Sequence, residues 1–247
     1  MGLCVSRAHL IVARLPRAGE RILLSAEEAA HARARRLSAG DAVVLLDGSG
    51  SEGDGILLRL DGRAAEVEIE RIHTRAESAP VISVFVAGIR LERLAWIAEK
   101  ATELSAARLV ILRTERTQTF RAAASALLRL ERVVREAAKQ CGAPRWPEVC
   151  GPVSVVEVLS SERASRLLFC DEGGVRFPVR LETGPTSLLV GPEGGWSEEE
   201  RRAAREAGAS AVALPAGRLR TETAAVAALV LARAAHARGA NAVDGRR

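Results

Sequence analysis

Residues 188–200 read Leu188-Leu-Val-Gly-Pro-Glu-Gly-Gly-Trp-Ser-Glu-Glu-Glu200 and pass from an apolar run to an acidic one through three glycines. The apolar start predicts a strand buried on both faces, as in a parallel sheet. Ser197, followed three residues later by Glu200, predicts a capping box that opens a helix. In open α/β sheets, ligands bind at the carboxyl ends of the strands, and glycine there lets the backbone approach a ligand closely. The segment therefore indicates an α/β domain with a candidate binding loop at 191–195.

This loop differs from the common nucleotide-binding loops. It lacks the G-x-G-x-x-G of dinucleotide sites, and no Gly-Lys-Ser/Thr follows as in a Walker A loop. The three glutamates 198–200 would stabilise the helix dipole but would repel a phosphate. We therefore do not expect a polyphosphate ligand. The alternative is an ordinary strand-to-helix turn without a ligand, which spacing alone favours.

A second segment, Leu214-Pro-Ala-Gly-Arg-Leu-Arg-Thr-Glu-Thr-Ala224, repeats the order of strand, loop and helix. Thr221 is the predicted N-cap of a helix over 222–237. That helix is almost purely Ala, Val and Leu, so we expect it to be buried, with a subunit interface as one candidate place. If the two strands are neighbours, the two turns form one pocket.

Outward from these segments, apolar strand-length runs alternate with helical periodicity from residue 80 onward, which predicts a parallel sheet covered on both faces. The expected strands are 81–87, 109–112, 167–170, 187–190 and 211–214, and the expected helices are 90–104, 122–140, 198–207 and 222–237.

The first 73 residues have a different texture. Short runs predict strands at 41–47, 56–60 and 65–70, and residues 48–55 predict a glycine-rich turn. Ser25 and Glu28 predict a capping box that opens a short helix to about Arg36. We expect a small, mostly β domain over 1–73, a linker over 73–80 and an α/β domain over 80–240.

Charge is unevenly distributed along the 247 residues. The net charge is +5, yet residues 1–75 hold eleven basic and eleven acidic residues. Residues 108–145 hold nine basic residues against three acidic ones, which indicates either a phosphate-facing surface or a solvated helix face. Aromatic residues make up only 3%, which argues against an RNA-binding platform of stacked aromatic rings.

The cysteines and histidines show no metal-binding spacing. Cys4, Cys141, Cys150 and Cys170 form no C-x-x-C, and the four histidines are scattered, so we expect no metal. No apolar run approaches the length of a membrane span, and the first residues lack a signal-peptide pattern. We expect a cytoplasmic protein without membrane contact.

Residues 191–197 read G-P-E-G-G-W-S, and residues 219–224 read L-R-T-E-T-A. Residues 99–104, 114–116 and 136–142 read E-K-A-T-E-L, T-E-R and E-A-A-K-Q-C-G. These five segments resemble the motifs G-P-E-G-G-[FLW]-S, L-R-T-E-T-A, E-K-x-T-E-L, T/S-E-R and E-A-x-E-Q-x-G of the RsmE family of small-subunit ribosomal RNA (uridine-N3)-methyltransferases in the SPOUT superfamily, with Lys139 in place of the second Glu of the last motif. In the first domain, His31 to Asp41 resembles a family H-L-x-x-V-L-R-x-x-x-G-D segment. The match covers nearly the whole chain.

The resemblance implies a SPOUT-type α/β parallel-sheet domain with a C-terminal trefoil knot, preceded by a small PUA-like β-barrel domain. It implies S-adenosylmethionine as cofactor, a homodimer and ribosomal RNA of the small subunit as substrate. The implied cofactor contacts are Leu189, Val190, Gly191, Pro192, Glu193, Gly194, Gly195, Leu214, Leu219, Arg220, Thr221 and Thr223.

Methyl transfer to uracil N3 requires removal of the N3 proton, or stabilisation of the anion that remains. Glu222 is the candidate base or orients Arg220, which would steady a uracil oxygen or a phosphate. Stabilisation of the helix dipole is the alternative role of Glu222. The candidate RNA contacts are the basic residues Arg33, Arg35, Arg36, Arg116, Arg129, Arg132, Arg135 and Lys139.

The sequence departs from the family at 215–217, where Pro-Ala-Gly replaces the usual Gly-x-Arg and moves the arginine to Arg218. Two other functions stay open. A non-catalytic RNA-binding or ribosome assembly factor would keep the basic helix but would need no cofactor pocket. A SPOUT methyltransferase that acts on another RNA site would keep both.

Overall fold

A computed structural model describes residues 7–62, 64–74, 80–117, 124–162 and 165–244 of the chain. They form two compact units. Unit 1 is Met1–Glu77 together with Arg135–Trp146, and unit 2 is Ser78–Val134 together with Pro147–Arg247. The domain boundaries expected from the sequence place 135–146 in the second domain, whereas its contacts place it in unit 1.

Unit 1 is built on a five-stranded sheet with the order β1-β3-β4-β5-β2, in which only β1 and β3 run parallel. Residues of β5 such as Val67 and Ile69 alternate with polar ones, so one face of the strand is buried. Ala29 and Ala32 of α1 complete this core. The elements are β1 (Ala8–Ile11), β2 (Arg21–Leu23), α1 (Ala26–Ala34), β3 (Ala42–Leu46), β4 (Ser51–Leu60) and β5 (Ala65–Thr74).

Two expectations for this unit are wrong in detail. The glycine-rich residues 51–55 belong to strand β4 and do not form part of a turn. A Cβ on Gly55 would lie 2.7 Å from the carbonyl oxygen of Glu68, so glycine here allows close pairing at an irregularity of the β4–β5 ladder. Ser25 does cap α1, but Glu28 does not return the bond, because its carboxylate accepts from the backbone N–H of Ile11 at 3.0 Å.

Residues 135–146 join unit 1 through buried charges. Lys139 Nζ lies 3.0 Å from Glu28 Oε1 and 2.6 Å from Glu136 Oε1, and its side chain is only 3% exposed. Burial acts to lower the pKa of Lys139, but the hydrogen bonds to Glu136 and Glu28 outweigh it and raise the pKa. The main-chain oxygen of Lys139 also lies 3.0 Å from Nδ1 of His9 in β1.

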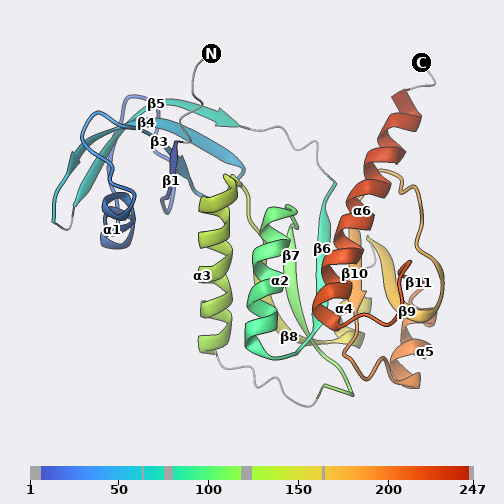
Figure 1. The fold of residues 1–247 in the computed structure, drawn as a ribbon. Coiled ribbons are helices and arrows are strands. Elements are labelled where there is room, and N and C mark those ends of the chain that lie inside the picture. Colours follow the sequence, from blue (N-terminus) through green and yellow to red (C-terminus); the bar gives the residue numbers. More distant parts are fainter. Residues whose placement is uncertain (1–6, 63, 75–79, 118–123, 163–164, 245–247) are drawn as a thin grey trace. The chain divides into compact units, whose positions relative to one another are not determined.

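Unit 2 is a six-stranded parallel sheet with the order β11-β9-β10-β6-β7-β8, flanked by helices (Figure 1). The strands are β6 (Ile82–Ala87), β7 (Arg108–Arg113), β8 (Glu148–Ser154), β9 (Arg166–Arg176), β10 (Thr186–Val190) and β11 (Ser210–Ala213). The helices are α2 (Leu91–Glu103), α3 (Ala124–Cys141), α4 (Val155–Ser161), α5 (Glu198–Glu206) and α6 (Thr221–Asp244), with the end of α3 in unit 1.

The sheet is buried on both faces, as its continuous apolar strands predict. Phe85, Phe169 and Leu189 share one face and pack against α4 and α5. Helices α2 and α6 pack side by side over the other face, and α6 contacts β6 and β10 (Figure 1). Every predicted strand and helix of this unit is present. The predicted parallel α/β fold is confirmed.

Two elements of unit 2 were not expected, namely β8 and α4. The sequence of β8 contains Gly151-Pro152, which indicates a break in a strand. In the structure β8 is the edge of the sheet and pairs only with β7, and an edge strand tolerates a proline that cannot donate to the ladder. The trefoil knot stays a prediction, because strand order and register do not determine how a chain is threaded.

Candidate functional site

The loop 191–195 lies at the carboxyl end of β10 and lines a cavity of about 470 Å³. The 214–221 loop, which follows β11, lines the same cavity. Strands β10 and β11 are not neighbours, because β9 lies between them, so the middle of β9, beside the carboxyl end of β10, contributes the wall between the two loops. The lining residues from β9 are Cys170, Asp171 and Glu172, and Trp196 and Arg201 complete that side.

Trp196 shapes the floor of this cavity. Its side chain is 1% exposed, its ring stacks on Phe169 with centroids 4.3 Å apart, and its Nε1 donates to the carbonyl oxygen of Cys170 at 2.8 Å. A Cβ on Gly191 would lie 2.8 Å from this indole ring, so the first position of the loop must be glycine. Gly195 has a φ of +69°, a conformation that favours glycine.

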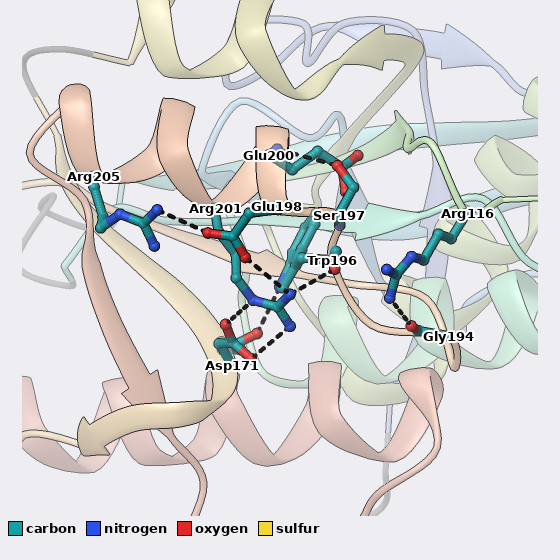
Figure 2. Close-up of polar contacts among 10 residues, drawn as sticks. Arg116, Asp171, Gly194, Trp196, Ser197, Glu198, Glu200, Arg201 and Arg205 are labelled. Carbon is teal, nitrogen blue, oxygen red and sulfur yellow. Dashed lines mark hydrogen bonds and ion pairs between the residues drawn. The ribbon is translucent and has the colours of Figure 1, made fainter.

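Arg201 connects two residues of the same cavity wall, Asp171 and Trp196 (Figure 2). Its Nε donates to Asp171 Oδ2 at 2.7 Å, and its Nη1 donates to the carbonyl oxygen of Trp196 at 2.9 Å. The hydrogen bond to Asp171 raises the pKa of the guanidinium. Burial raises the pKa of the Cys170 thiol to about 12, so this cysteine lines the cavity as a neutral thiol and not as a nucleophile.

The predicted capping box at the start of α5 is confirmed. Ser197 Oγ accepts from the backbone N–H of Glu200 at 3.2 Å, and Glu200 Oε2 accepts from the backbone N–H of Ser197 at 2.8 Å (Figure 2). The other oxygen of Glu200 accepts from the backbone N–H of Glu115 at 2.9 Å. One carboxylate thus attaches the turn after β7 to the helix that follows the cavity loop.

Three side chains hold the carbonyl oxygens of the loop. Thr221 Oγ1 donates to Gly191 at 3.0 Å, Arg218 Nη2 donates to Glu193 at 3.2 Å, and Arg116 Nη1 donates to Gly194 at 2.8 Å. Figure 2 shows the hydrogen bond from Arg116, a residue in the turn after β7, to Gly194. The expectation that Thr221 is an N-cap is wrong, because α6 begins at Thr221 itself and its hydroxyl bonds the loop.

A charged group lies beside the loop at the start of α2 and α6. The guanidinium of Arg93 donates through Nη1 to Glu193 Oε1, and its Nε lies 3.5 Å from Glu222 Oε1. The Glu222 side chain is only 14% exposed. Arg220, in contrast, is exposed. Neither Arg220 nor Glu222 lines the cavity.

Most of the predicted cofactor contacts lie in the cavity wall. The residues found there are Val190, Gly191, Pro192, Glu193, Gly194, Gly195, Leu214, Leu219 and Thr221. Leu189 is instead fully buried in the sheet, and Arg220 and Thr223 are exposed outside the cavity. The part of the wall that comes from β9 was missed, because no sequence signal places that strand between β10 and β11.

The predicted RNA contacts separate into exposed and buried residues. Arg129, Arg132 and Arg135 are exposed along α3, and Arg33, Arg35 and Arg36 are exposed at the end of α1. Arg33 donates to the carbonyl oxygen of Asp61 at 2.9 Å. Lys139 is withdrawn from the prediction, because an ammonium enclosed by two carboxylates is not available to a phosphate. Arg121, part of the basic segment 108–145, lies outside the described residues.

No group of His, Cys, Asp and Glu within the described ranges could hold a metal ion. Over the same residues, no helix is both long and apolar enough to cross a membrane.

The class of protein to which this parallel sheet, its cavity and the preceding β unit belong follows from two family models. A family model described as an RNA methyltransferase domain matches residues 76–233, and one described as an RNA methyltransferase PUA domain matches residues 24–70. The chain therefore contains the expected RNA methyltransferase domain and PUA domain.

Proteins of similar sequence show which family of RNA methyltransferases this chain belongs to. Ribosomal RNA small subunit methyltransferase E of Aquifex aeolicus is 30% identical over 216 residues, which cover 85% of this chain and 93% of that protein. The Mycobacterium bovis protein of the same name is 30% identical, with 87% of each chain covered. The chain belongs to the ribosomal RNA small subunit methyltransferase E family, the RsmE family that its motifs resemble.

Solved methyltransferase structures are similar to this chain over most of its length. Ribosomal RNA small subunit methyltransferase E of Neisseria gonorrhoeae, bound to S-adenosyl methionine, has a TM-score of 0.79 and 28% identity, and the match covers 91% of this chain and 95% of that one. A Legionella pneumophila protein, solved with SAM as its bound cofactor, has a TM-score of 0.81 and 26% identity, with 92% and 97% covered.

Proposed function

We propose that this protein transfers a methyl group from S-adenosylmethionine to N3 of a uridine in small-subunit ribosomal RNA. The observation that carries the proposal is the shared cavity of the 191–195 and 214–221 loops, the two segments with the family motifs. Two similar solved structures contain S-adenosylmethionine, which supports the same ligand here.

The cavity suits this cofactor. Its volume of about 470 Å³ is within the range typical of small-molecule sites. Leu214 and Leu219 offer apolar surface. The carboxylates of Glu172 and Glu193 also line the cavity, each paired with an arginine, Arg218 and Arg93 respectively. Because Gly191 has no Cβ, the loop backbone can lie against the Trp196 ring. When bound, the cofactor supplies an electrophilic methyl group.

The chain must activate the uracil nitrogen. We assign Glu222 as the base that takes the N3 proton, so that the nitrogen electron pair becomes available to the methyl carbon. Arg220, exposed at the start of α6, steadies a uracil oxygen or a neighbouring phosphate. The remaining cofactor contacts are those of the two cavity loops, with Leu189, Arg220 and Thr223 retained as the family resemblance implies them.

The RNA must present an unpaired base. Because N3 lies on the Watson–Crick edge, the target uridine has to be single-stranded or withdrawn from its pair. We propose that Arg33, Arg35, Arg36, Arg116 and the arginines of α3 contact phosphates. We further propose that the protein acts as a homodimer in the cytoplasm, with α6 as a candidate contact between subunits.

The test is methylation of small-subunit RNA with labelled cofactor, followed by mass analysis of the nucleosides. We expect 3-methyluridine with the unaltered protein and a loss of about 10²–10⁴ in rate for Glu222→Gln, the range typical of a general base. Arg220→Ala should also slow transfer. Near-native rates for both variants would contradict the catalytic assignment.

A thermal shift separates the enzyme from a non-catalytic assembly factor. A ligand that binds only the native state increases the free energy of unfolding, by about 2.7 kcal/mol when its concentration is about a hundred times Kd. The melting temperature rises as a result. We expect such a shift with S-adenosylmethionine. No shift, together with retained RNA binding, would favour the assembly factor. A methylated nucleoside other than 3-methyluridine would indicate another RNA site.

A further inference from the structure

Arg93 connects two carboxylates that belong to different elements. It lies in the first turn of α2, which follows β6, and β6 is the sheet neighbour of β10. Because both strands end at the same edge, the start of α2 reaches the loop after β10. Arg93 there contacts Glu193 through Nη1 and Glu222 through Nε, two nitrogens of one planar group.

The two carboxylates differ in their surroundings. The Glu193 side chain is 56% exposed and lines the cofactor cavity, whereas the Glu222 side chain is 14% exposed. Oε1 of Glu222 faces Arg93 at 3.5 Å. Oε2 of Glu222 is buried and has no hydrogen-bond partner among the described residues. A buried carboxylate oxygen without a donor is unfavourable, so a donor from a bound molecule is expected to complete this site.

We propose that Arg93 is a positioning residue for methyl transfer, an inference that rests on the proposed function. Arg93 holds Glu222 by Oε1 and leaves Oε2 without a partner among the described residues. Oε2 is covered in the free protein and lies outside the cavity, so it accepts the N3–H of uracil once bound RNA opens a path to it. The N3 proton passes to Oε2, the N3 electron pair forms the bond to the methyl carbon, and the carbon–sulfur electrons leave with sulfur as a neutral thioether. Atoms and charge balance without a further reactant.

The contact to Glu193 gives Arg93 a second role in the same geometry. Glu193 belongs to the loop that lines the cofactor cavity, so one guanidinium sets the base and the cofactor loop relative to each other. The backbone of that loop does not depend on Arg93 alone, because Arg218 and Arg116 hold the carbonyl oxygens of Glu193 and Gly194. Loss of Arg93 should therefore affect the chemical step more than cofactor binding.

The ordinary alternative is a surface ion pair without a role in catalysis. Such pairs contribute little to stability, and their removal leaves activity unchanged. The two roles predict different outcomes when Arg93 and Glu222 are altered together, because a residue that acts only through Glu222 has no effect once Glu222 is disabled.

The experiment compares Arg93→Met, Arg93→Lys, Glu222→Gln and the double variant Arg93→Met/Glu222→Gln in the full chain. Arg202→Met is the matched control, since it removes the same charge from an exposed pair with Glu206 on α5. The rate of methyl transfer is measured at saturating RNA and cofactor, and cofactor Kd is measured by calorimetry.

We expect Arg93→Met to slow transfer by about 10- to 100-fold, a part of what a general base contributes, while cofactor Kd changes by less than about threefold. Arg93→Lys should recover only part of the rate. It keeps the positive charge, but one ammonium cannot contact both carboxylates as the fork of an arginine does. The double variant should be no slower than Glu222→Gln, and Arg202→Met should match the unaltered protein.

Losses that multiply in the double variant, or a near-native rate for Arg93→Met, would overturn the positioning role. The proposed function would stand in both cases, provided that the unaltered protein makes 3-methyluridine. Absence of 3-methyluridine from the unaltered reaction would instead overturn the proposed function itself.

Discussion

At the scale of single residues, Gly191 packs so closely against the indole ring of Trp196 that a side chain at position 191 would clash with it. The indole ring is held by the stack on Phe169 and by the bond from Nε1 to the carbonyl oxygen of Cys170, and Arg201 holds the backbone carbonyl oxygen of the same residue, Trp196. It cannot move away from an added methyl group. The glycine of the loop is therefore required by packing as well as by the approach of a ligand.

We predict that Gly191→Ala destabilises the protein by about 1–3 kcal/mol, the usual effect of overpacking, because its Cβ would lie 2.8 Å from the Trp196 ring. Cofactor affinity should fall as the loop shifts. Chemical denaturation and a cofactor titration measure the two effects. Gly173→Ala is the control, since a Cβ there meets nothing within 4 Å. Equal stability of the two variants would contradict the packing argument.

At the scale of elements, α3 contains both exposed and buried cations. Arg129 and Arg132 are exposed on the part of the helix that belongs to unit 2, and Lys139 is enclosed by Glu28 and Glu136 on the part that belongs to unit 1. Charge along a helix thus does not tell which residues meet a partner. Exposure separates the candidates for RNA contact from the structural cation.

We predict that Arg129→Glu/Arg132→Glu weakens binding of small-subunit RNA and lowers the dependence of log K on log salt by about 0.7–0.9 for each phosphate contact that is lost. Cofactor affinity should stay the same. The matched control is Arg202→Glu/Arg205→Glu on α5, which changes the net charge equally. If both double variants weaken binding to the same degree, net charge and not the α3 face accounts for RNA affinity.

At the scale of the whole molecule, the chain crosses between its units more than once. Unit 1 is completed by Arg135–Trp146, which returns from the second half of α3. The pair of Lys139 and Glu28 ties this segment to α1, and Arg145 adds a bond from Nη2 to the carbonyl oxygen of Ser49 at 2.8 Å. We infer that the fold of unit 1 depends on a segment more than fifty residues away.

We predict that Lys139→Met destabilises unit 1 by about 3–5 kcal/mol, because it leaves the carboxylate of Glu28 buried without its cation. Hydrogen exchange measures this locally, since the backbone N–H of Ile11 donates to Glu28 and should lose protection. Lys139→Met/Glu28→Gln removes both charges and should recover much of the loss. Unchanged exchange at Ile11 in Lys139→Met would show that the pair contributes nothing.

The sequence alone determined those features of the protein that depend on residues close together in the chain. The strands and helices of unit 2 other than β8 and α4, the Ser197–Glu200 capping box and the glycine loop at 191–195 depend on residues that are adjacent or a few positions apart. Periodicity, caps and glycines therefore predict them. The motifs that resemble the RsmE family include the two cavity loops, which is why the fold class, the family and these two loops could be predicted.

Tertiary structure alone decided the rest, because it depends on contacts between residues far apart in sequence. The sheet order places β9 between β10 and β11 and so adds Asp171 and Glu172 to the cavity. Packing buries Lys139 and removes it from the RNA-contact prediction. Arg93 meets Glu193 and Glu222 only because three separate elements end at one edge of the sheet. Side chains that no local pattern joins are brought together there by the alignment of parallel strands.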